Sequence, residues 1–393
     1  MKIVHLCLNG PFTEGWGYQE NLLAKYHALA GHEVTVIAGQ ETHLPSGRIV
    51  QVPCGEKTIE NGVRLIRVPK NPKGLSFVRR IFARHDVLPL LKKIQPDLVM
   101  IHGMVGDVSA LQVKRYVGMG ASARVVMDIH QDQNNTLLPR SAFKRTMLRT
   151  LHRWVNGRMY PLCRRIYYVA PSCGALARAY YAVPEQKLSF LPLGCDTELS
   201  ESIDRETALG KVRPEFGFSR DDILILHGGK LDEKKRTLDV IEAVKAVHQE
   251  NARVKLVVFG AAAPEYQKQL DDALKGTEAF IKFCGYCPPE SYYRLMKSSD
   301  IAVFPGSRSA LWQQAASCAL ALMVPGTSED TYLDRGGNVL FLPSGGAGDI
   351  ADALRAAIKD DAYVAMQQAA LLKAVPFFSY KALAQRVIDE AMQ

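Results

Sequence analysis

Short, almost wholly apolar runs recur along the chain, and a longer amphipathic segment separates most of them. Strands that are buried on both faces of a sheet read as continuous apolar runs. Alternation of such strands with helices is typical of βα units, in which crossover helices join parallel strands. In the first half the runs are KIVHLCL, VTVIAG, VRLIRV, DLVMIHG, ARVVMDIH and RIYYVAPS.

A second series of the same kind follows the polar stretch SESIDRETALGKVRPEFGFSRDD, and it reads ILILHGGKL, VKLVVFG, FIKFCGY, DIAVFPGS, ALMVPG and NVLFLP. A chain of 393 residues is too long for one ordinary core. We therefore predict an α/β fold of two Rossmann-like, doubly wound parallel-sheet domains, residues 1–197 and 198–377. A last helix within 378–393 is expected to pack back on the first domain.

Composition and segment lengths argue against several classes of protein. No stretch approaches the roughly 20 apolar residues of a membrane span, and the N-terminus reads as a buried strand rather than a signal peptide. The eight cysteines are scattered, and only Cys284 and Cys287 form a C-x-x-C, without a second pair to complete a zinc site. We expect a cytoplasmic protein with reduced thiols.

Several strands of the second series end in Gly or Gly-Pro, and ligands bind at this edge of open α/β sheets. The first of them runs into GGKLDEKKR, in which Lys230 and Lys235 stand five residues apart. A run of this kind is either a solvated turn or an anion site. The order of strands, glycine turns and helices in this half resembles the donor domain of the GT-B glycosyltransferase family 4, and the resemblance covers nearly the whole chain.

The resemblance implies two domains with a nucleotide-sugar donor bound in the cleft between them. The family carries G-R-L-x-x-x-K at this turn, and Gly229, Lys230, Leu231 and Lys235 occupy that spacing. The two cations would stabilise the charge that develops on the departing diphosphate. Lys230 replaces the family's Arg, so a point charge replaces a planar fork.

The segment PGSRSALWQQA departs from the family pattern. Members usually carry E-x7-E here, whereas this chain has Gln313 and Gln314 where the second Glu is expected and lacks the first. Glutamine can still accept a hydrogen bond from a ribose hydroxyl, although more weakly than a carboxylate, and both residues could equally lie on an ordinary helix face. Ser307 and Ser309 are expected to cap the helix that follows, whose first amides would face the diphosphate.

Other glycine turns complete the predicted donor site. Gly285 and Tyr286 follow the strand FIKFC where the family's backbone holds the base, and Gly260 ends VVFG nearby. Gly15 and Gly17 lie in the turn before the first helix, which matches a glycine-containing loop of the family. Amides in this loop can face the donor or the acceptor, but a simple tight turn explains the glycines equally well.

The strand ARVVMDIH ends in three polar residues, Asp128, His130 and Asp132, which share one face of an extended strand. Family members often place a His here, near the transferred sugar. The resemblance therefore assigns His130 to sugar contact or transition-state stabilisation, with Asp132 as a neighbour. A buried His satisfied by adjacent carboxylates and a metal site are the alternatives, and His102 is a second candidate.

Family 4 enzymes retain anomeric configuration, and a front-face transfer without a protein nucleophile is usually proposed for them. The sequence fits this scheme, because it has no convincing triad, P-loop or paired catalytic Glu. We expect no metal and no cofactor, since the nucleotide sugar is itself a substrate.

The segment 137–165 combines an apolar stripe with a row of arginines and has no acidic residue. An amphipathic basic helix suits an anionic membrane surface, although an apolar face packed on the first domain is an equal alternative. Relatives of this kind often glycosylate lipid-linked sugars, so we expect a lipid-linked or polysaccharide-precursor acceptor and no nucleic acid. The apolar residues are Phe143, Met147, Leu151, Trp154 and Val155, and the arginines are Arg145, Arg149 and Arg153.

The sequence analysis thus favours a retaining glycosyltransferase of polysaccharide assembly. The missing glutamates leave open a catalytically weak or inactive nucleotide-sugar-binding partner subunit. A sugar-nucleotide epimerase of the same architecture is a third hypothesis.

Overall fold

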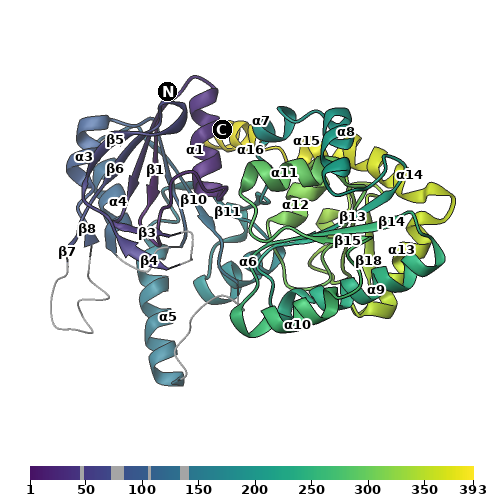
Figure 1. Ribbon diagram of the computed structural model, residues 1–393. Helices are drawn as coiled ribbons and strands as arrows, with labels where there is room; N and C mark the ends of the chain where they lie inside the picture. Colours follow the sequence, from purple (N-terminus) through teal and green to yellow (C-terminus); the bar gives the residue numbers. More distant parts are fainter. Residues whose placement is uncertain (45–47, 72–83, 105–107, 133–140) are drawn as a thin grey trace. The chain divides into compact units, whose positions relative to one another are not determined.

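The computed structural model describes residues 1–44, 48–71, 84–104, 108–132 and 141–393. The chain forms two compact units: unit 1 comprises Met1–Pro192 and Leu383–Gln393, and unit 2 comprises Leu193–Ala382. Each unit is a parallel sheet covered by helices, as the predicted α/β fold requires (Figure 1).

The sheet of unit 1 has eight strands in the order β12-β11-β10-β9-β1-β2-β6-β5. All neighbours are parallel except β5 and β6, which are antiparallel. Because β1 lies inside the sheet, with later strands on both sides, the chain reverses its winding there, and loops at the carboxyl ends of β1 and β9 become neighbours. The strands are β1 (Lys2–Cys7), β2 (Glu33–Ala38), β5 (Gly55–Thr58), β6 (Arg64–Arg67), β9 (Leu98–Ile101), β10 (Arg124–Ile129), β11 (Cys163–Tyr168) and β12 (Leu188–Phe190).

Helices pack on this sheet and two small antiparallel pairs lie beside it. The helices are α1 (Gln19–Leu29), α3 (Leu88–Ile94), α4 (Leu111–Gly118), α5 (Ala142–Gly157), α6 (Pro171–Leu176) and α16 (Tyr380–Met392). The small pairs are β3 (Glu41–His43) with β4 (Ile49–Gln51), and β7 (Lys70–Asn71) with β8 (Arg84–His85).

Helix α16 returns to unit 1 after the chain has completed unit 2. Its Arg386 donates to the carbonyl of Phe190 at 2.7 Å and to the Ser189 hydroxyl at 3.0 Å. Apolar residues on its inner face are buried, among them Leu383 and Val387. Helix α16 is therefore an integral part of unit 1.

The sheet of unit 2 has six parallel strands in the order β15-β14-β13-β16-β17-β18. The strands are β13 (Ile223–Gly228), β14 (Val254–Phe259), β15 (Ile281–Phe283), β16 (Ile301–Val303), β17 (Ala321–Pro325) and β18 (Val339–Leu342). The helices are α7 (Thr197–Glu201), α8 (Arg205–Glu215), α9 (Thr237–Glu250), α10 (Pro264–Leu274), α11 (Pro289–Ser298), α12 (Leu311–Ser317), α13 (Ala347–Ile358), α14 (Ala362–Ala369) and α15 (Val375–Phe377).

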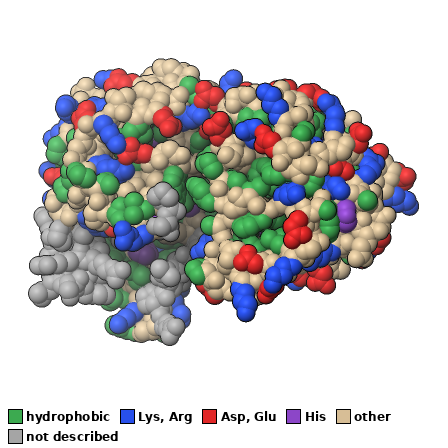
Figure 2. Space-filling model, viewed as in Figure 1, with side chains coloured by type: hydrophobic (Ala, Val, Ile, Leu, Met, Phe, Trp, Pro, Cys, Tyr) green, Lys and Arg blue, Asp and Glu red, His purple; other side chains and the backbone are tan. Residues whose placement is uncertain are grey.

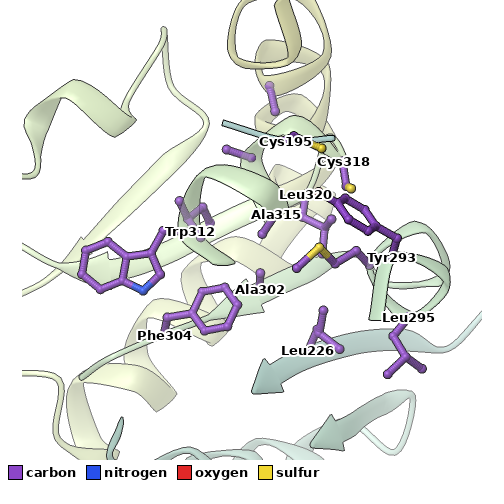
Figure 3. Packing of buried hydrophobic residues seen from close by; sticks show 14 of the residues in the cluster. Cys195, Leu226, Tyr293, Leu295, Ala302, Phe304, Trp312, Ala315, Cys318 and Leu320 are labelled. Atoms are coloured by element: carbon purple, nitrogen blue, oxygen red, sulfur yellow. The ribbon is translucent and has the colours of Figure 1, made fainter. Parts of the chain in front are cut away.

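A hydrophobic cluster packs against each face of this second sheet. Alternate residues of β13 point to opposite faces, so Ile223 and Ile225 join one cluster, and Leu224 and Leu226 join the other. Figure 3 shows part of the second cluster, with side chains of α11 and α12 gathered over strand residues such as Leu226.

The polar stretch between the two series of strands is packed inside unit 2. Asp204 caps α8, with its carboxylate accepting from the backbone N–H of Thr207 at 2.7 Å. Arg213 of α8 is buried and donates to Asp300 at 2.7 Å. The two compact units separate earlier in the chain, between Pro192 and Leu193.

Candidate active site

At the edge of unit 2 where β13, β14 and β15 end, the turns that follow these strands contact one another through their backbone atoms. Gly229 and Gly260 have φ of +125° and +129°, in the region that favours glycine. A Cβ on Gly260 would lie 1.7 Å from the carbonyl oxygen of Gly229, and the Gly260 N–H donates to the carbonyl of Gly285 at 2.6 Å. Gly260 thus lies in direct contact with the backbone of both Gly229 and Gly285 and leaves no room for a side chain of its own.

The loop after β16 is fixed to the lysine turn that follows β13. Lys235 Nζ donates to the carbonyl of Ser307 at 2.6 Å and to that of Arg308 at 3.3 Å. The N–H of Ser307 donates to the carbonyl of Lys234 at 2.8 Å, and a Cβ on Gly306 would lie 2.1 Å from that same oxygen. Burial lowers the pKa of Lys235, while Asp232 nearby acts in the opposite direction.

Lys230 differs from Lys235 in its surroundings. Its side chain is exposed, whereas Lys235 is half-buried and held by carbonyl groups. The turn therefore offers one fixed and one solvent-facing ammonium group at the same edge. Tyr286, which follows Gly285, is 65% exposed.

Helix α12 is capped differently from the prediction. Its N-cap residue is Ala310, and the Ser309 hydroxyl accepts only from the N–H of Leu311, at 3.3 Å. Ser307 lies three residues before this N-cap, and α12 has no side-chain cap hydrogen bond, so the prediction that Ser307 caps the helix is wrong. With seven residues, α12 also carries only a short stack of peptide dipoles.

Gln313 and Gln314 are both buried, with 4% of each exposed. Gln313 Nε2 donates to the hydroxyl of Tyr332 at 2.6 Å. Burial raises the pKa of Tyr292, and a hydrogen bond with Gln314 opposes that rise. Both glutamines therefore lie inside unit 2, on a helix whose residues Trp312–Ser317 are all buried.

Arg308 is a charged group at this edge that the sequence reasoning missed. Its guanidinium contacts Glu329 and Asp330, each at 2.7 Å, and Asp330 is buried. Ion pairs with both acids raise the pKa of Arg308 although burial acts against this. The acids follow Arg308 by about twenty positions, a separation at which no sequence pattern identifies partners.

In unit 1, the loop between β1 and α1 holds the other predicted glycines. Gly15 has a φ of +71°, which explains its type, whereas Gly17 is not among the positions with positive φ. Trp16 between them stacks on His43, with 5.2 Å between ring centroids. Glu14 contacts Lys57 at 2.7 Å and Arg67 at 3.3 Å, which fixes the loop to β5 and β6.

At the end of β10, the acid that contacts His130 is Asp128. Asp128 Oδ1 lies 3.0 Å from His130 Nε2, and its Oδ2 lies 2.7 Å from His102 Nδ1. The Gly103 N–H also donates to Asp128, at 2.7 Å. Asp132 instead accepts from the Ser172 hydroxyl at 3.3 Å. Residues 133–140, which include the polar Gln133, Asn134 and Asn135, lie outside the described residues.

Asp128 and His130 shift each other's protonation. Burial acts to raise the pKa of Asp128, but the charges of His130 and His102 and their hydrogen bonds outweigh it and hold this pKa well below its usual range. Burial acts to lower the pKa of His130, but Asp128 raises it to about 9. His130 is therefore an imidazolium at neutral pH, with 31% of its side chain exposed.

The ring nitrogens of His102 and His130 and a carboxylate oxygen of Asp128 lie within 4.8 Å of one another. Such a spacing suits a cation as well as an ion-paired cluster. Both imidazoles contact the carboxylate directly at hydrogen-bond distances, so the described geometry is that of an ion-paired cluster.

Comparison with known families accounts for both halves of the chain. Residues 21–199 match the model described as glycosyltransferase family 4, and residues 210–370 match that of the glycosyl transferases group 1. The chain is a GT-B glycosyltransferase of the family 4 type.

Individual relatives of this glycosyltransferase are distant. It is 26% identical over 101 residues to the putative glycosyltransferase EpsD of Bacillus subtilis (strain 168), so the match spans about a quarter of that relative and of this chain. A glycosyltransferase from Rickettsia africae ESF-5 has the same fold, with a TM-score of 0.69 at 12% identity over 99% of this chain and 97% of that one. Anabaena Alr3699/HepE superposes with a TM-score of 0.68 at 15% identity over 99% of both chains.

Proposed function

We propose that this glycosyltransferase takes a sugar from a nucleoside diphosphate sugar and that the carboxyl edge of the unit 2 sheet binds the donor. The observation that carries the proposal is the pairing of Lys235, held by the Ser307 and Arg308 carbonyls, with the exposed Lys230 above close-packed glycines. A fixed ammonium group stabilises developing phosphate charge without reorganising during the reaction. Solved structures of the fold relative HepE contain UDP and UDP-glucose, which supports a diphosphate donor.

Donor binding is tested by the melting temperature, since a ligand that binds only the folded state raises it by mass action. The ligands are UDP, GDP, ADP and CMP at millimolar concentration, with their common sugar conjugates. One nucleotide should raise the melting temperature of the wild type and of Lys234→Ala, but not that of Lys230→Ala. Lys234 is an exposed neighbour in the same turn, so it controls for lost positive charge. Absence of a shift with every ligand would contradict the donor site.

His130 is assigned to a hydrogen bond with a sugar hydroxyl or with negative charge that develops during transfer. Its raised pKa keeps the imidazolium available across the neutral range. The reaction is proposed to retain anomeric configuration and to need neither metal nor cofactor. Activity that persists in EDTA, together with an unchanged anomeric configuration of the product by proton NMR, would support both statements. Loss of activity in EDTA that Mg²⁺ or Zn²⁺ restores would contradict the second.

The exposed side chains of helix α5 are the basis on which we propose a lipid-linked or polysaccharide-precursor acceptor. Phe143 and Trp154 are 77% and 46% exposed, so the alternative of an apolar face packed on unit 1 does not hold for them. Figure 1 shows α5 extending from the sheet of unit 1, and in the same view basic side chains lie at its far end (Figure 2). Residues 137–140 of the basic segment lie outside the described residues. No helix in the described ranges is long and apolar enough to span a membrane.

This surface fits an anionic lipid headgroup layer, with aromatic side chains entering it and arginines contacting phosphates. The full-length protein should sediment with phosphatidylglycerol vesicles and not with phosphatidylcholine vesicles, and salt should weaken this binding. The double change Phe143→Ser and Trp154→Ser should release it, whereas Leu371→Ser, at a residue of unit 2 that is 60% exposed, should not. Equal binding to both kinds of vesicle would contradict the assignment.

The second candidate function is that of a partner subunit that binds the nucleotide sugar and has weak or no transferase activity. Gln313 and Gln314 carry it, because neutral amides stand where the family's second carboxylate is expected. Measurement of sugar release from the donor that raises the melting temperature separates the two candidates. Binding without turnover, with and without acceptor extracts, would favour the second.

A further inference from the structure

Three buried histidines connect Asp128 to the last helix of unit 1. His27 Nε2 lies 3.0 Å from the carbonyl oxygen of Ala384 in α16, and His27 Nδ1 lies 3.0 Å from His5 Nε2. His5 Nδ1 lies 2.9 Å from His102 Nε2, and His102 Nδ1 lies 2.7 Å from Asp128 Oδ2. His5 and His27 are wholly buried and His102 is 6% exposed, so water does not replace these contacts. We call this set the histidine chain.

The two ends of the histidine chain fix the number of its protons. A carbonyl and a carboxylate can only accept hydrogen bonds, and a neutral imidazole carries one N–H and one acceptor nitrogen. Four hydrogen bonds need four protons, but three neutral imidazoles supply only three. The complete chain therefore holds one proton more than its neutral imidazoles carry.

We propose that His5, His27 and His102 share this additional proton beside Asp128 and act as positioning residues for His130. The proton balances the buried carboxylate, so the cluster avoids the large cost of an uncompensated buried charge. Asp128 then offers its other oxygen to His130, 3.0 Å away. The role of His130 itself rests on the proposed function above.

The additional proton belongs at the Asp128 end of the chain, where a carboxylate is in direct contact with it. Burial lowers the pKa of His5 well below its usual range and that of His27 to about 4, so both favour the neutral form. The ordered assignment is N–H at Nε2 of His27 and of His5, and both nitrogens of His102 protonated. The other titratable or charged groups that face the cluster are Cys7 on β1, Glu20 on α1, His32 after α1, and Arg67 on β6.

The first test is nitrogen-15 NMR of the wild-type protein labelled at histidine. Tautomers and the doubly protonated ring give distinct nitrogen shifts. We expect His5 and His27 as Nε2–H tautomers and His102 with a proton on each ring nitrogen, with and without EDTA. Three neutral rings would overturn the proposal, and so would shifts that change when EDTA removes a bound cation from His102.

The second test measures the pKa of His130 in two variants of His5. In His5→Leu no acceptor remains for His102 Nε2, so His102 becomes neutral and donates from Nδ1 to Asp128. The carboxylate charge is then opposed only by His130, whose pKa should rise by about half a unit or more. In His5→Asn the side-chain oxygen takes the place of Nδ1 and keeps the acceptor, so the His130 pKa should stay at the wild-type value.

An unchanged or lowered His130 pKa in a folded His5→Leu protein would overturn the shared proton. Simple loosening of the site would lower that pKa, because it weakens the contact with Asp128. If His5→Leu does not fold, the wild-type shifts still decide the question. Neither test uses donor or acceptor, so the histidine chain can fail while the glycosyltransferase reaction stands, and the reverse.

Discussion

Units 1 and 2 have similar parallel sheets but build their carboxyl edges in opposite ways. In unit 2 the edge is made from backbone, with Gly229, Gly260 and Gly285 in contact and lysines around them. In unit 1 it is made from buried side chains, with Asp128 between His102 and His130. The backbone contact at Gly260 leaves no room for an added atom, whereas a side-chain edge depends on protons and charges. Steric changes should therefore damage unit 2 most, and changes of pH should affect unit 1 most.

The largest effect is expected from Gly260→Ala. Its Cβ would overlap the Gly229 carbonyl at 1.7 Å, in addition to the strain of positive φ. We expect a loss of more than about 3 kcal/mol in the free energy of unfolding, measured by urea denaturation, with loss of donor binding. The control is Gly276→Ala, where φ is +73° but nothing lies within 4 Å, and the loss should be about 1 kcal/mol. Equal losses at the two positions would show that backbone contact is not what defines this edge.

Lys230→Ala should lower kcat/KM for transfer by about 100-fold, because one cation that stabilises the departing diphosphate is lost. The melting temperature without ligand should stay within about 1 °C of the wild type, since the side chain is exposed. Lys230→Arg restores the family's residue and should keep wild-type activity or exceed it. If Lys234→Ala were as damaging as Lys230→Ala, general positive charge rather than this position would be responsible.

The pH dependence of stability should come from unit 1. The pKa of His130 is raised to about 9 from about 6.5, so its stabilisation is complete below pH 6.5 and is lost as the pH rises through 9. Urea denaturation between pH 6.5 and 9.5 should show a decline of about 3 kcal/mol in the wild type. His130→Gln should flatten this part of the curve, while Lys230→Ala should leave it unchanged. A decline that persists in His130→Gln would assign it to another group.

Below pH 6.5 the free energy of unfolding should change with pH in the opposite direction. The pKa of His27 is lowered to about 4 by burial, so its neutral form contributes stability that is lost as the pH falls from about 6.5 towards 4. His27→Gln removes this titration. In a plot of the free energy of unfolding against pH, the slope below pH 6.5 should then decrease by the amount that corresponds to about one proton. The partly exposed neighbour His32, changed to Gln, should leave the slope closer to wild type.

The smallest effect concerns Ala319, which has a φ of +61° in the turn between α12 and β17. Alanine at positive φ is strained, so Ala319→Gly should stabilise unit 2 by up to about 1 kcal/mol in thermal unfolding. Ala365→Gly in the middle of α14 should destabilise by a similar amount, because glycine gains freedom in the unfolded chain. Destabilisation at both positions would contradict the strain at Ala319.

The contrast between the two edges also explains what could be predicted from the sequence. Buried parallel strands leave apolar runs, and tight backbone contacts leave glycines, so the fold and the positions of Gly229, Gly260 and Gly285 were predictable. The histidine chain was not, since His5 and His27 lie within apolar segments and contact partners far along the chain. Only hydrogen bonds between distant elements distinguish them from ordinary core positions.

A local signal also failed at the start of α12. Ser307 has a side chain suited to a helix cap, but the helix begins later, with Ala310 as its N-cap residue. Asp128 was expected beside Asp132 as one of three polar groups at a strand end, yet it is wholly buried and pairs with two histidines. The roles of the site residues in binding and transfer remain predictions for the experiments above.

The path of α16 has a consequence for synthesis of the protein. Residues Leu383–Gln393 complete unit 1, but the ribosome makes them only after all of unit 2. Unit 2 can therefore finish folding while unit 1 still exposes the surface that Leu383 and Val387 will cover. The unit that is translated first is the one that matures last, and the carbonyl of Ala384 reaches His27 only in that final step.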